Sequence, residues 1–332
     1  MILAFPASRL GYFKVVGPVI EAAIKHDHRV RLFWRHDMKP GEMVSRKELQ
    51  RRWKATVITE PMRVDAVIGP TLHTHDLSAW APARIVSLDY SWEQANAPVR
   101  PDLTQCYVTD YQRELAGGAG PVIGSTQLEA WRDAYPMRLG SKPVLLLFSC
   151  KFRVGGWRRW AYRWVGYRSL LGRLRQWCDR EGYTLIVKSR PKHHDPRYVE
   201  QIADRVYGES GLYPSLALRL MRSATVAVHF QSNAALELAH AGIPQYSVRM
   251  PQPHLKAYRT TPEVYSGVEG TLGHWPGVIR LLTGVPNPYT LDSGALRDYR
   301  DRYLGPAGAP ARVLDLIERP LGCGVSLSEV TA

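Results

Sequence analysis

The chain has 332 residues, 45% of them hydrophobic, which is enough to bury a full core, and its length suggests two domains. Lys and Arg number 44 against 30 Asp and Glu, so the net charge is +14 and indicates an anionic partner: nucleic acid, an anionic membrane surface or a phosphorylated substrate. The four cysteines show no CxxC spacing, so the sequence indicates neither a zinc site nor a disulfide framework.

Targeting signals are the next feature that the sequence can exclude. Residues 1–6 lack the charged region and long apolar run of a signal peptide, and no segment approaches the ~20 apolar residues of a spanning helix. The cysteine pattern fits a reducing compartment. We therefore expect a cytoplasmic protein whose membrane contact, if any, is peripheral at the inner membrane.

Short apolar strands alternate with helices or long loops through the first part of the chain. This alternation predicts a parallel, doubly wound α/β sheet rather than a sandwich. Strands are expected at residues 2–5, 30–34, 64–68, 85–88, 107–108 and 121–124, and helices at residues 15–24, 42–53 and 125–135.

The same pattern restarts after a linker around residues 135–142. We therefore expect an N-terminal Rossmann-like domain at residues 1–138, a second at residues 139–300, and a C-terminal helix and tail at residues 301–332. The strands of the second domain are expected at residues 143–148, 184–187, 225–228 and 245–248, and helices at residues 170–181, 216–221, 234–241 and 311–318.

The stretch RSATVAVHFQSNAALELAHAGIPQYSVRM, residues 222–250, reads as strand, polar turn, helix, glycine stop and strand. Polar groups at the carboxyl end of a parallel strand, next to a helix N-terminus, favour a bound phosphate. An ordinary βαβ turn capped by Ser232 is the alternative. The candidate phosphate-binding residues are Gln231, Ser232, Asn233 and Ala234.

The segment KSRPKHHDP, residues 188–196, also follows a strand and concentrates basic side chains that suit a diphosphate. We expect it on the strand next to the polar turn, and a basic surface loop is the alternative. Glu237, in the following helix, can accept hydrogen bonds from ribose hydroxyls. From spacing alone an ordinary exposed helix glutamate is the better interpretation, and only the surrounding context favours the ribose contact. The candidates in the basic segment are Lys188, Arg190, Lys192 and His193.

Two loops of the first domain, LHTHD and LDYSWE, place histidine or carboxylate side chains after consecutive strands, where a general base is needed. The candidates are His75, Asp76 and Asp89, each of which has a helix cap or turn former as its alternative role. No GxSxG elbow and no GxxxxGK[ST] loop is present, which disfavours a serine hydrolase and a P-loop kinase.

Residues 151–175, KFRVGGWRRWAYRWVGYRSLLGRLR, contain no acidic residue and interleave arginine with tryptophan and tyrosine. This composition suits stacked bases, a phosphate backbone or the interface of an anionic bilayer, and a basic loop with packed tryptophans is the alternative. The candidate acceptor-binding residues are Arg153, Trp157, Arg158, Arg159 and Arg163.

The ordered stretches GPVIGSTQLEAW, KPVLLLFSC, YTLIVKSRPKHHDP and VHFQSNAALELAHAGIPQYSV resemble glycosyltransferases of the GT-B type. The resemblance is strongest to the group around CDP-glycerol glycerophosphotransferases, capsule sugar transferases and non-hydrolysing UDP-N-acetylglucosamine epimerases. It implies two Rossmann-like domains facing across a cleft, with the donor on the second, the acceptor on the first, and no bound metal. By position it implies phosphate contacts from Arg190, Lys192 or His193 and from the turn at residues 232–234, and ribose contacts from Glu237.

These observations predict an inverting glycosyltransferase that needs no cofactor and uses a UDP- or CDP-linked donor as co-substrate. It would move a sugar or polyol-phosphate to a hydroxyl of an anionic acceptor, first of all a cell-surface glycan or lipid-linked acceptor. A phage-type enzyme that glycosylates hydroxymethylated DNA is an alternative that explains the basic charge equally well. A sugar-nucleotide epimerase and a non-catalytic nucleic-acid-binding protein remain further alternatives.

Overall fold

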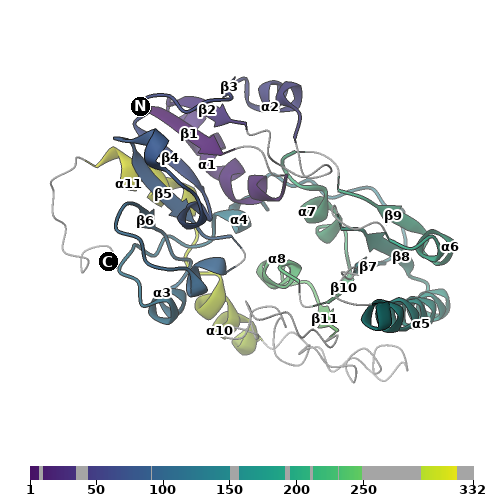
Figure 1. Cartoon of the computed structure of the whole chain (residues 1–332). Helices are drawn as coiled ribbons and strands as arrows, with labels where there is room; N and C mark the ends of the chain where they lie inside the picture. The colour runs from purple at the N-terminus through teal and green to yellow at the C-terminus, as the bar shows by residue number, and fades with distance from the viewer. Residues whose placement is uncertain are drawn as a thin grey trace. The chain divides into compact units, whose positions relative to one another are not determined.

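The computed structural model divides the chain into two compact units (Figure 1). Unit 1 comprises Met1–Asp133, Leu212–Pro214 and Asp301–Ala332, and unit 2 comprises Ala134–Gly211 and Ser215–Arg300. None of the described helices is long and apolar enough to cross a membrane. The structure describes residues 1–6, 10–34, 44–90, 92–149, 157–190, 195–209, 212–230, 232–248 and 293–319.

Unit 1 contains a six-stranded parallel sheet in the order β3-β2-β1-β4-β5-β6. The strand order reverses between β1 and β4, and this is the switch point at which open α/β sheets usually bind ligands. The parallel sheet confirms the expected fold class for this half of the chain. The strands are β1 (Ile2–Pro6), β2 (Arg29–Phe33), β3 (Thr56–Ile58), β4 (Ala66–Pro70), β5 (Arg84–Leu88) and β6 (Thr104–Gln105).

Helices α1, α4 and α11 pack against one another in unit 1. On α1 the predicted inward residues Val15, Val19 and Ala23 are buried, but so is every residue from Val15 to Ile20, and α11 buries Val313, Leu314 and Ile317. A separate cluster around Trp80 packs with Val67 and Ile85 of the sheet. The helices are α1 (Phe13–Lys25), α2 (Arg46–Trp53), α3 (Asp110–Ala116), α4 (Thr126–Glu129), α10 (Ser293–Tyr303, which ends in unit 1) and α11 (Ala309–Glu318), with short 3-10 helices η1 (Leu10–Tyr12), η2 (Leu72–Thr74), η3 (Ser78–Trp80) and η4 (Glu93–Asn96).

The end of the first domain differs from the sequence-based expectation. The strands expected at residues 107–108 and 121–124 are reduced to one isolated bridge between Tyr107 and Val122. Pairing with β5 instead falls three residues earlier, at 104–105, with Ser87 opposite Gln105. Gly120 explains the short pairing, because a Cβ there would lie 1.8 Å from the carbonyl oxygen of Gln105, so the chain crosses this backbone closely instead of extending beside it.

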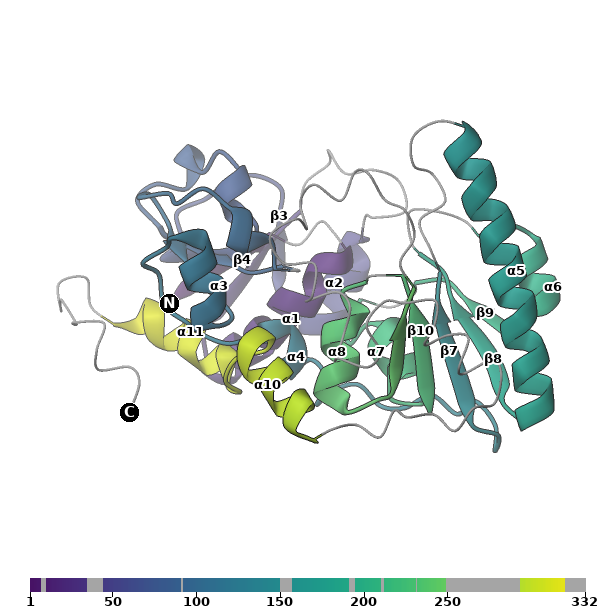
Figure 2. The same ribbon diagram turned by 90° about the horizontal axis from the view of Figure 1, so that it is seen from below.

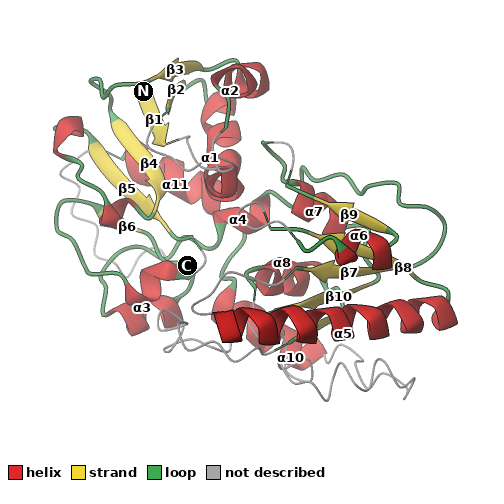
Figure 3. Ribbon diagram, turned by 45° about the vertical axis from the view of Figure 1, so that its right-hand side comes forward, coloured by secondary structure: helices red, strands yellow, loops and turns green. Residues whose placement is uncertain are grey.

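Unit 2 contains a five-stranded parallel sheet in the order β11-β10-β7-β8-β9. Strands β7, β8, β9 and β10 of this sheet are labelled in Figure 3. All residues of the central strand β7 are buried, as expected for a strand covered on both faces. Helices α5 and α6 cover one face and α7 and α8 the other (Figure 2). The elements are β7 (Val144–Phe148), α5 (Trp157–Glu181), β8 (Thr184–Lys188), α6 (Tyr198–Ile202), β9 (Arg205–Tyr207), α7 (Leu216–Met221), β10 (Val226–His229), α8 (Ala234–Ala241) and β11 (Gln245–Ser247).

Residues 212–214 belong to unit 1 although the chain on both sides of them belongs to unit 2. The Tyr213 ring packs directly on α1, where a Cβ added at Gly17 would lie 2.5 Å from a ring carbon. The Tyr213 hydroxyl donates to Asp133 Oδ2 at 2.7 Å, and Arg52 Nε donates to the Tyr213 carbonyl at 3.1 Å. This segment is therefore fixed through Tyr213, by the packing of its ring and by hydrogen bonds at its hydroxyl and its carbonyl.

Substitution Gly17→Ala is expected to destabilise the protein by about 1–2 kcal/mol, because overpacking against Tyr213 outweighs the helix propensity gained. Gly172→Ala in α5 is the matched control, since an added Cβ there meets no atom within 4 Å. The control should gain about 0.5–1 kcal/mol from propensity alone. Urea unfolding followed by circular dichroism measures both, and equal stabilisation of the two variants would contradict the tight approach.

Candidate functional site

The candidate donor site lies at the carboxyl edge of the sheet in unit 2. The strand order reverses between β7 and β10, which makes this edge the switch point of the unit. The expectation that the basic segment and the polar turn follow neighbouring strands is wrong, because β7 lies between β8 and β10. Since all pairs are parallel, the loops that carry Arg190 and Ser232 still leave the sheet at the same edge.

His229, at the end of β10, sets the polar turn. It is fully buried, its Nε2 lies 2.8 Å from Gln245 Oε1, and its Nδ1 accepts from the Ser232 N–H at 3.4 Å. Because Nδ1 accepts, Nε2 carries the proton and donates to Gln245. Gln245 in turn donates to the Ala235 carbonyl at 3.1 Å. Burial lowers the pKa of His229 to about 4, so this imidazole is neutral and holds the turn against α8.

Helix α8 begins at Ala234, with Asn233 as its N-cap residue and without a capping side-chain hydrogen bond. Ser232 Oγ accepts from the Ala234 N–H at 3.4 Å, so the serine supports the turn without being the N-cap residue. The predicted end of the helix is confirmed, because Gly242 follows it with a left-handed φ of 69°. Glu237 is fully buried and is therefore not an exposed helix glutamate.

Lys188 has a different environment from the one its sequence context suggests. Its ammonium forms an ion pair with Glu209 Oε2 at 2.9 Å, with side-chain exposures of 4% and 10%. Lys188 Nζ also donates to the Ser189 carbonyl at 2.7 Å. The charge of Lys188 is thus balanced inside the protein, which leaves less of it for the donor phosphate contact that the sequence predicts.

Asp195 connects the ends of β7 and β8. Its two carboxylate oxygens accept from the hydroxyls of Ser149 and Ser189, and burial raises the pKa of this carboxyl group. Arg190 Nε donates to the Ser149 carbonyl at 3.1 Å, which places the arginine at the switch-point edge. The candidates Lys192, His193 and Gln231 lie outside the described residues.

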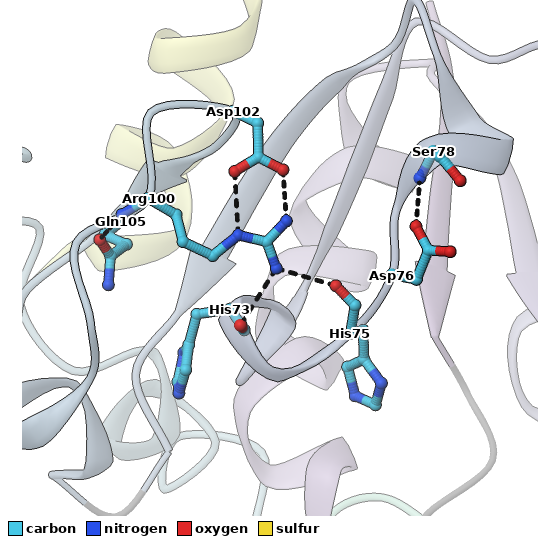
Figure 4. Close-up of polar contacts among 7 residues, drawn as sticks. All are labelled: His73, His75, Asp76, Ser78, Arg100, Asp102 and Gln105. Carbon is cyan, nitrogen blue, oxygen red and sulfur yellow. Dashed lines mark hydrogen bonds and ion pairs between the residues drawn. The ribbon is translucent and has the colours of Figure 1, made fainter.

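In unit 1 the loop after β4 carries the candidates His75 and Asp76, and Arg100 fixes its backbone (Figure 4). Arg100 Nη1 donates to the carbonyls of His73 at 3.1 Å and of His75 at 2.8 Å. The other side of the guanidinium binds the Asp102 carboxylate through Nε and Nη2, with Nε 2.9 Å from Oδ1. We call residues 73–75 the histidine turn. One arginine therefore fixes the backbone at both of its ends.

A buried polar network supports this arginine. Arg100 N–H donates to Gln105 Oε1 at 3.1 Å, Gln105 donates to Gln94 Oε1 at 3.1 Å, and Gln94 donates to Ser87 Oγ at 3.0 Å. Ser87 Oγ also accepts from the Leu72 N–H at 3.1 Å, just before the histidine turn. Sequence reasoning missed these residues because isolated glutamine and serine side chains carry no motif.

The two acidic candidates of unit 1 both act as turn formers. Asp76 is exposed, and the backbone N–H of Ser78, which donates to its Oδ1 at 3.0 Å, lowers the pKa of this carboxyl group. Asp89 accepts from the Trp92 N–H at 2.9 Å, the Gln94 N–H at 3.1 Å and Gln112 Nε2 at 2.8 Å. Enclosure of the Asp89 carboxylate by protein raises its pKa to about 6, although part of the residue surface remains accessible.

The arginine and tryptophan candidates for acceptor binding fall largely outside the described part of the chain. Arg153 precedes the described residues of this region. Residues 157–166 form the first turns of α5, so this stretch is helical and is not the loop of the alternative interpretation. The side chains of Trp157, Arg158, Arg159 and Arg163 lie outside the described residues.

No family model and no curated relative matches the sequence. Solved structures match over nearly the whole chain. UDP-GlcNAc 2-epimerase from Neisseria meningitidis bound to UDP-GlcNAc superposes with a TM-score of 0.53 at 12% identity, covering 95% of this chain and 99% of that chain. UGT89C1 from Arabidopsis thaliana complexed with UDP-L-rhamnose superposes with a TM-score of 0.55 at 11% identity, covering 95% of this chain and 97% of that chain. The chain has the GT-B fold.

A third structure, UDP-N-acetylglucosamine 2-epimerase from Rickettsia bellii, gives a TM-score of 0.52 at 13% identity over 95% of both chains. These likenesses concern the fold, which the resemblance had predicted, and they agree with the two parallel sheets described above. They do not by themselves assign a reaction to this chain.

Proposed function

We propose that this GT-B protein is a nucleotide-sugar-dependent glycosyltransferase. The observation that carries the proposal is the switch-point edge of unit 2, where the turn set by His229 and the Arg190 side chain leave the sheet together. Ligands of open α/β sheets bind at such an edge. The neighbours solved with UDP-GlcNAc and UDP-L-rhamnose support a nucleotide sugar as the ligand.

The proposed chemistry is the displacement of a nucleoside diphosphate by an acceptor hydroxyl. The N-terminus of α8 and the guanidinium of Arg190 stabilise the negative charge that develops on the leaving group, without a metal ion. A base from unit 1 removes the hydroxyl proton, and attack from the opposite face inverts the sugar carbon.

The proposed acceptor is anionic, because the chain carries a net charge of +14. In unit 1 this charge is concentrated on α2 and the residue after it, where Arg46, Lys47, Arg51 and Lys54 are exposed. The acceptor that we propose first is a lipid-linked or cell-surface glycan at the inner membrane. Cosedimentation with anionic liposomes would favour this acceptor, whereas salt-sensitive binding of duplex DNA would favour a DNA-modifying enzyme.

Titration calorimetry against UDP, CDP, GDP and CMP tests the donor site. We expect one nucleoside diphosphate to bind, and Arg190→Gln to weaken its binding by about tenfold or more, since a charge-assisted hydrogen bond contributes about 1.5–3 kcal/mol. Arg205→Gln is the matched control, because Arg205 is exposed and begins β9 at the amino edge of the same sheet. Absence of binding, or equal affinities of the two variants, would contradict the proposal.

A sugar-nucleotide epimerase is the second candidate, favoured by the two epimerase structures that share the fold. An epimerase would convert the donor without an acceptor. Product analysis after incubation with the donor alone decides between the two, since an epimerised nucleotide sugar excludes the transferase and an unchanged donor excludes the epimerase.

A further inference from the structure

The histidine turn of unit 1 lies at the ligand-binding edge of its sheet. The turn follows β4, and the strand order reverses between β1 and β4. Thr71, two residues before the turn, has a left-handed φ of 55°, a conformation that is costly for a β-branched residue. The Tyr12 hydroxyl lies 3.0 Å from Thr71 Oγ1 and connects this position to the loop after β1.

Three hydrogen bonds from two side chains fix the backbone in and just before the histidine turn. One guanidinium fixes the carbonyls of His73 and His75, and the Ser87 hydroxyl fixes the preceding N–H. Because Arg100 is itself bound by Asp102 and Gln105, the backbone of the turn cannot shift without breaking several hydrogen bonds. Rigid positioning of this kind is what a reacting group needs.

His73 is the side chain of this turn that sequence reasoning passed over. Its Nδ1 is buried and has no hydrogen-bond partner among the residues that the structure describes. An unpaired buried polar atom costs about 1–3 kcal/mol and therefore calls for an explanation. His73 as a residue is part-exposed, and its second nitrogen, Nε2, is not among the buried atoms without a partner.

The surroundings of His73 keep its imidazole neutral. Burial lowers the pKa of His73, and the charges of His75 and Arg100 lower it further. Asp102 and Asp76 are the acidic groups near this arginine, and Asp102 is already paired with it. The ring therefore presents an unprotonated nitrogen near neutral pH, as a general base must.

The two acidic candidates for this role are engaged in other hydrogen bonds. Both Asp89 oxygens accept hydrogen bonds from the loop after β5 and from α3, and Asp76 accepts from Ser78. Figure 4 draws the His73 ring on the side of the turn away from Asp102, clear of the contacts that fix Arg100.

We propose that His73 is the catalytic residue that takes the proton of the acceptor hydroxyl and that Arg100 is its positioning residue, an assignment that rests on the proposed function. In this step the acceptor O–H bond breaks and its proton moves to His73 Nε2. The acceptor oxygen bonds to the sugar carbon, and the bond from that carbon to the diphosphate oxygen breaks, with its electron pair leaving on the nucleoside diphosphate.

Three variants and a control test the assignment: His73→Gln, Arg100→Gln, Arg100→Lys and Arg113→Gln. The control removes an arginine that pairs with Asp110 on α3 and does not touch the turn. Donor turnover is measured with anionic acceptors and with water, and donor affinity is measured separately by calorimetry. His73→Gln should lower kcat about 100-fold or more and leave nucleotide affinity unchanged, whereas Arg113→Gln should match the wild type.

The pH dependence of kcat/KM distinguishes a positioning role of Arg100 from a role in protein stability alone. Arg100→Gln removes a positive neighbour, so the pKa of His73 rises and the acid limb of kcat/KM moves to higher pH. Arg100→Lys keeps the positive charge but loses the hydrogen bonds to the carbonyls of His73 and His75. For this variant kcat should fall, and the acid limb of kcat/KM should move less than it does in Arg100→Gln. His73→Asn replaces His73→Gln if the latter does not fold, as judged by circular dichroism.

Each result decides one of the two proposals. One result is that the wild type binds a nucleotide but turns over the donor no faster than His73→Gln does, or not at all. That result overturns the assignment of His73 and leaves the proposed donor binding supported. If the wild type binds no nucleotide, the proposed function fails and the assignment fails with it. An unchanged acid limb in Arg100→Gln overturns the positioning role.

Discussion

Substitution Glu209→Ala is expected to destabilise unit 2 by about 3–5 kcal/mol, because it leaves the ammonium of Lys188 buried without a counter-charge. Glu209 Oε1 also accepts from the Leu216 N–H at 3.1 Å, at the start of α7. The pair therefore joins the end of β8 to the first turn of a helix. Urea unfolding followed by circular dichroism measures the loss, and hydrogen exchange in β8 and α7 assigns it to unit 2.

Two further variants make this result specific. The double variant Lys188→Met/Glu209→Leu should recover most of the stability, because apolar side chains of similar volume replace a buried ion pair at little net cost. Glu181→Ala breaks the exposed pair with Arg180 and should change stability by less than about 1 kcal/mol. A loss of that small size for Glu209→Ala would contradict the buried ion pair.

The double variant also tests the role that the sequence gives to Lys188. If it binds nucleotide as tightly as the wild type, Lys188 is a structural residue and the phosphate contacts come from elsewhere on the edge. If nucleotide affinity falls by about tenfold or more while stability is recovered, the lysine exchanges Glu209 for the ligand.

The free energy of unfolding is expected to fall by roughly 3 kcal/mol between pH 6.5 and pH 4 because of His229 alone. The pKa of the folded state is lowered to about 4 by burial, so the unfolded chain takes up a proton in this window while the folded chain does not. Stability is thus unaffected above about pH 6.5 and is lost as the pH falls.

Comparison with His229→Gln isolates this effect from other titrating groups. The variant should be less stable at neutral pH, because the turn loses its acceptor for the Ser232 N–H, yet its stability should fall less on acidification. The raised pKa of Asp195 acts in the opposite direction in both proteins and cancels in the difference. His240→Gln, in the same α8, is the control, and parallel pH curves for wild type and His229→Gln would contradict the prediction.

The sequence predicts the sheets well because strands buried on both faces need continuous apolar runs. The run VLLLF at β7 and the glycine after α8 are local signals, and both are where they were expected. β6 was misplaced because its position depends on register with β5, which is a non-local property. β3, β9, α3 and α6 were missed, since short elements carry too few residues to show a period.

The candidate site is predicted less well because its chemistry depends on contacts between distant residues. Lys188 reads as one of a row of basic side chains, but Glu209 determines its environment. His73 and His75 are the same residue type two positions apart, and only the missing partner of His73 Nδ1 distinguishes them. No spacing rule connects Arg100 to the turn that it fixes.

The insertion of residues 212–214 and of α11 into unit 1 has a consequence for how the protein is made. Residues 1–133 are synthesised before Tyr213, which covers Gly17, and before α11, which packs on α1. Part of the α1 surface therefore stays exposed during synthesis until α11 has been made. We expect a fragment of residues 1–133 alone to expose this apolar surface and to lack part of the packing of the first unit.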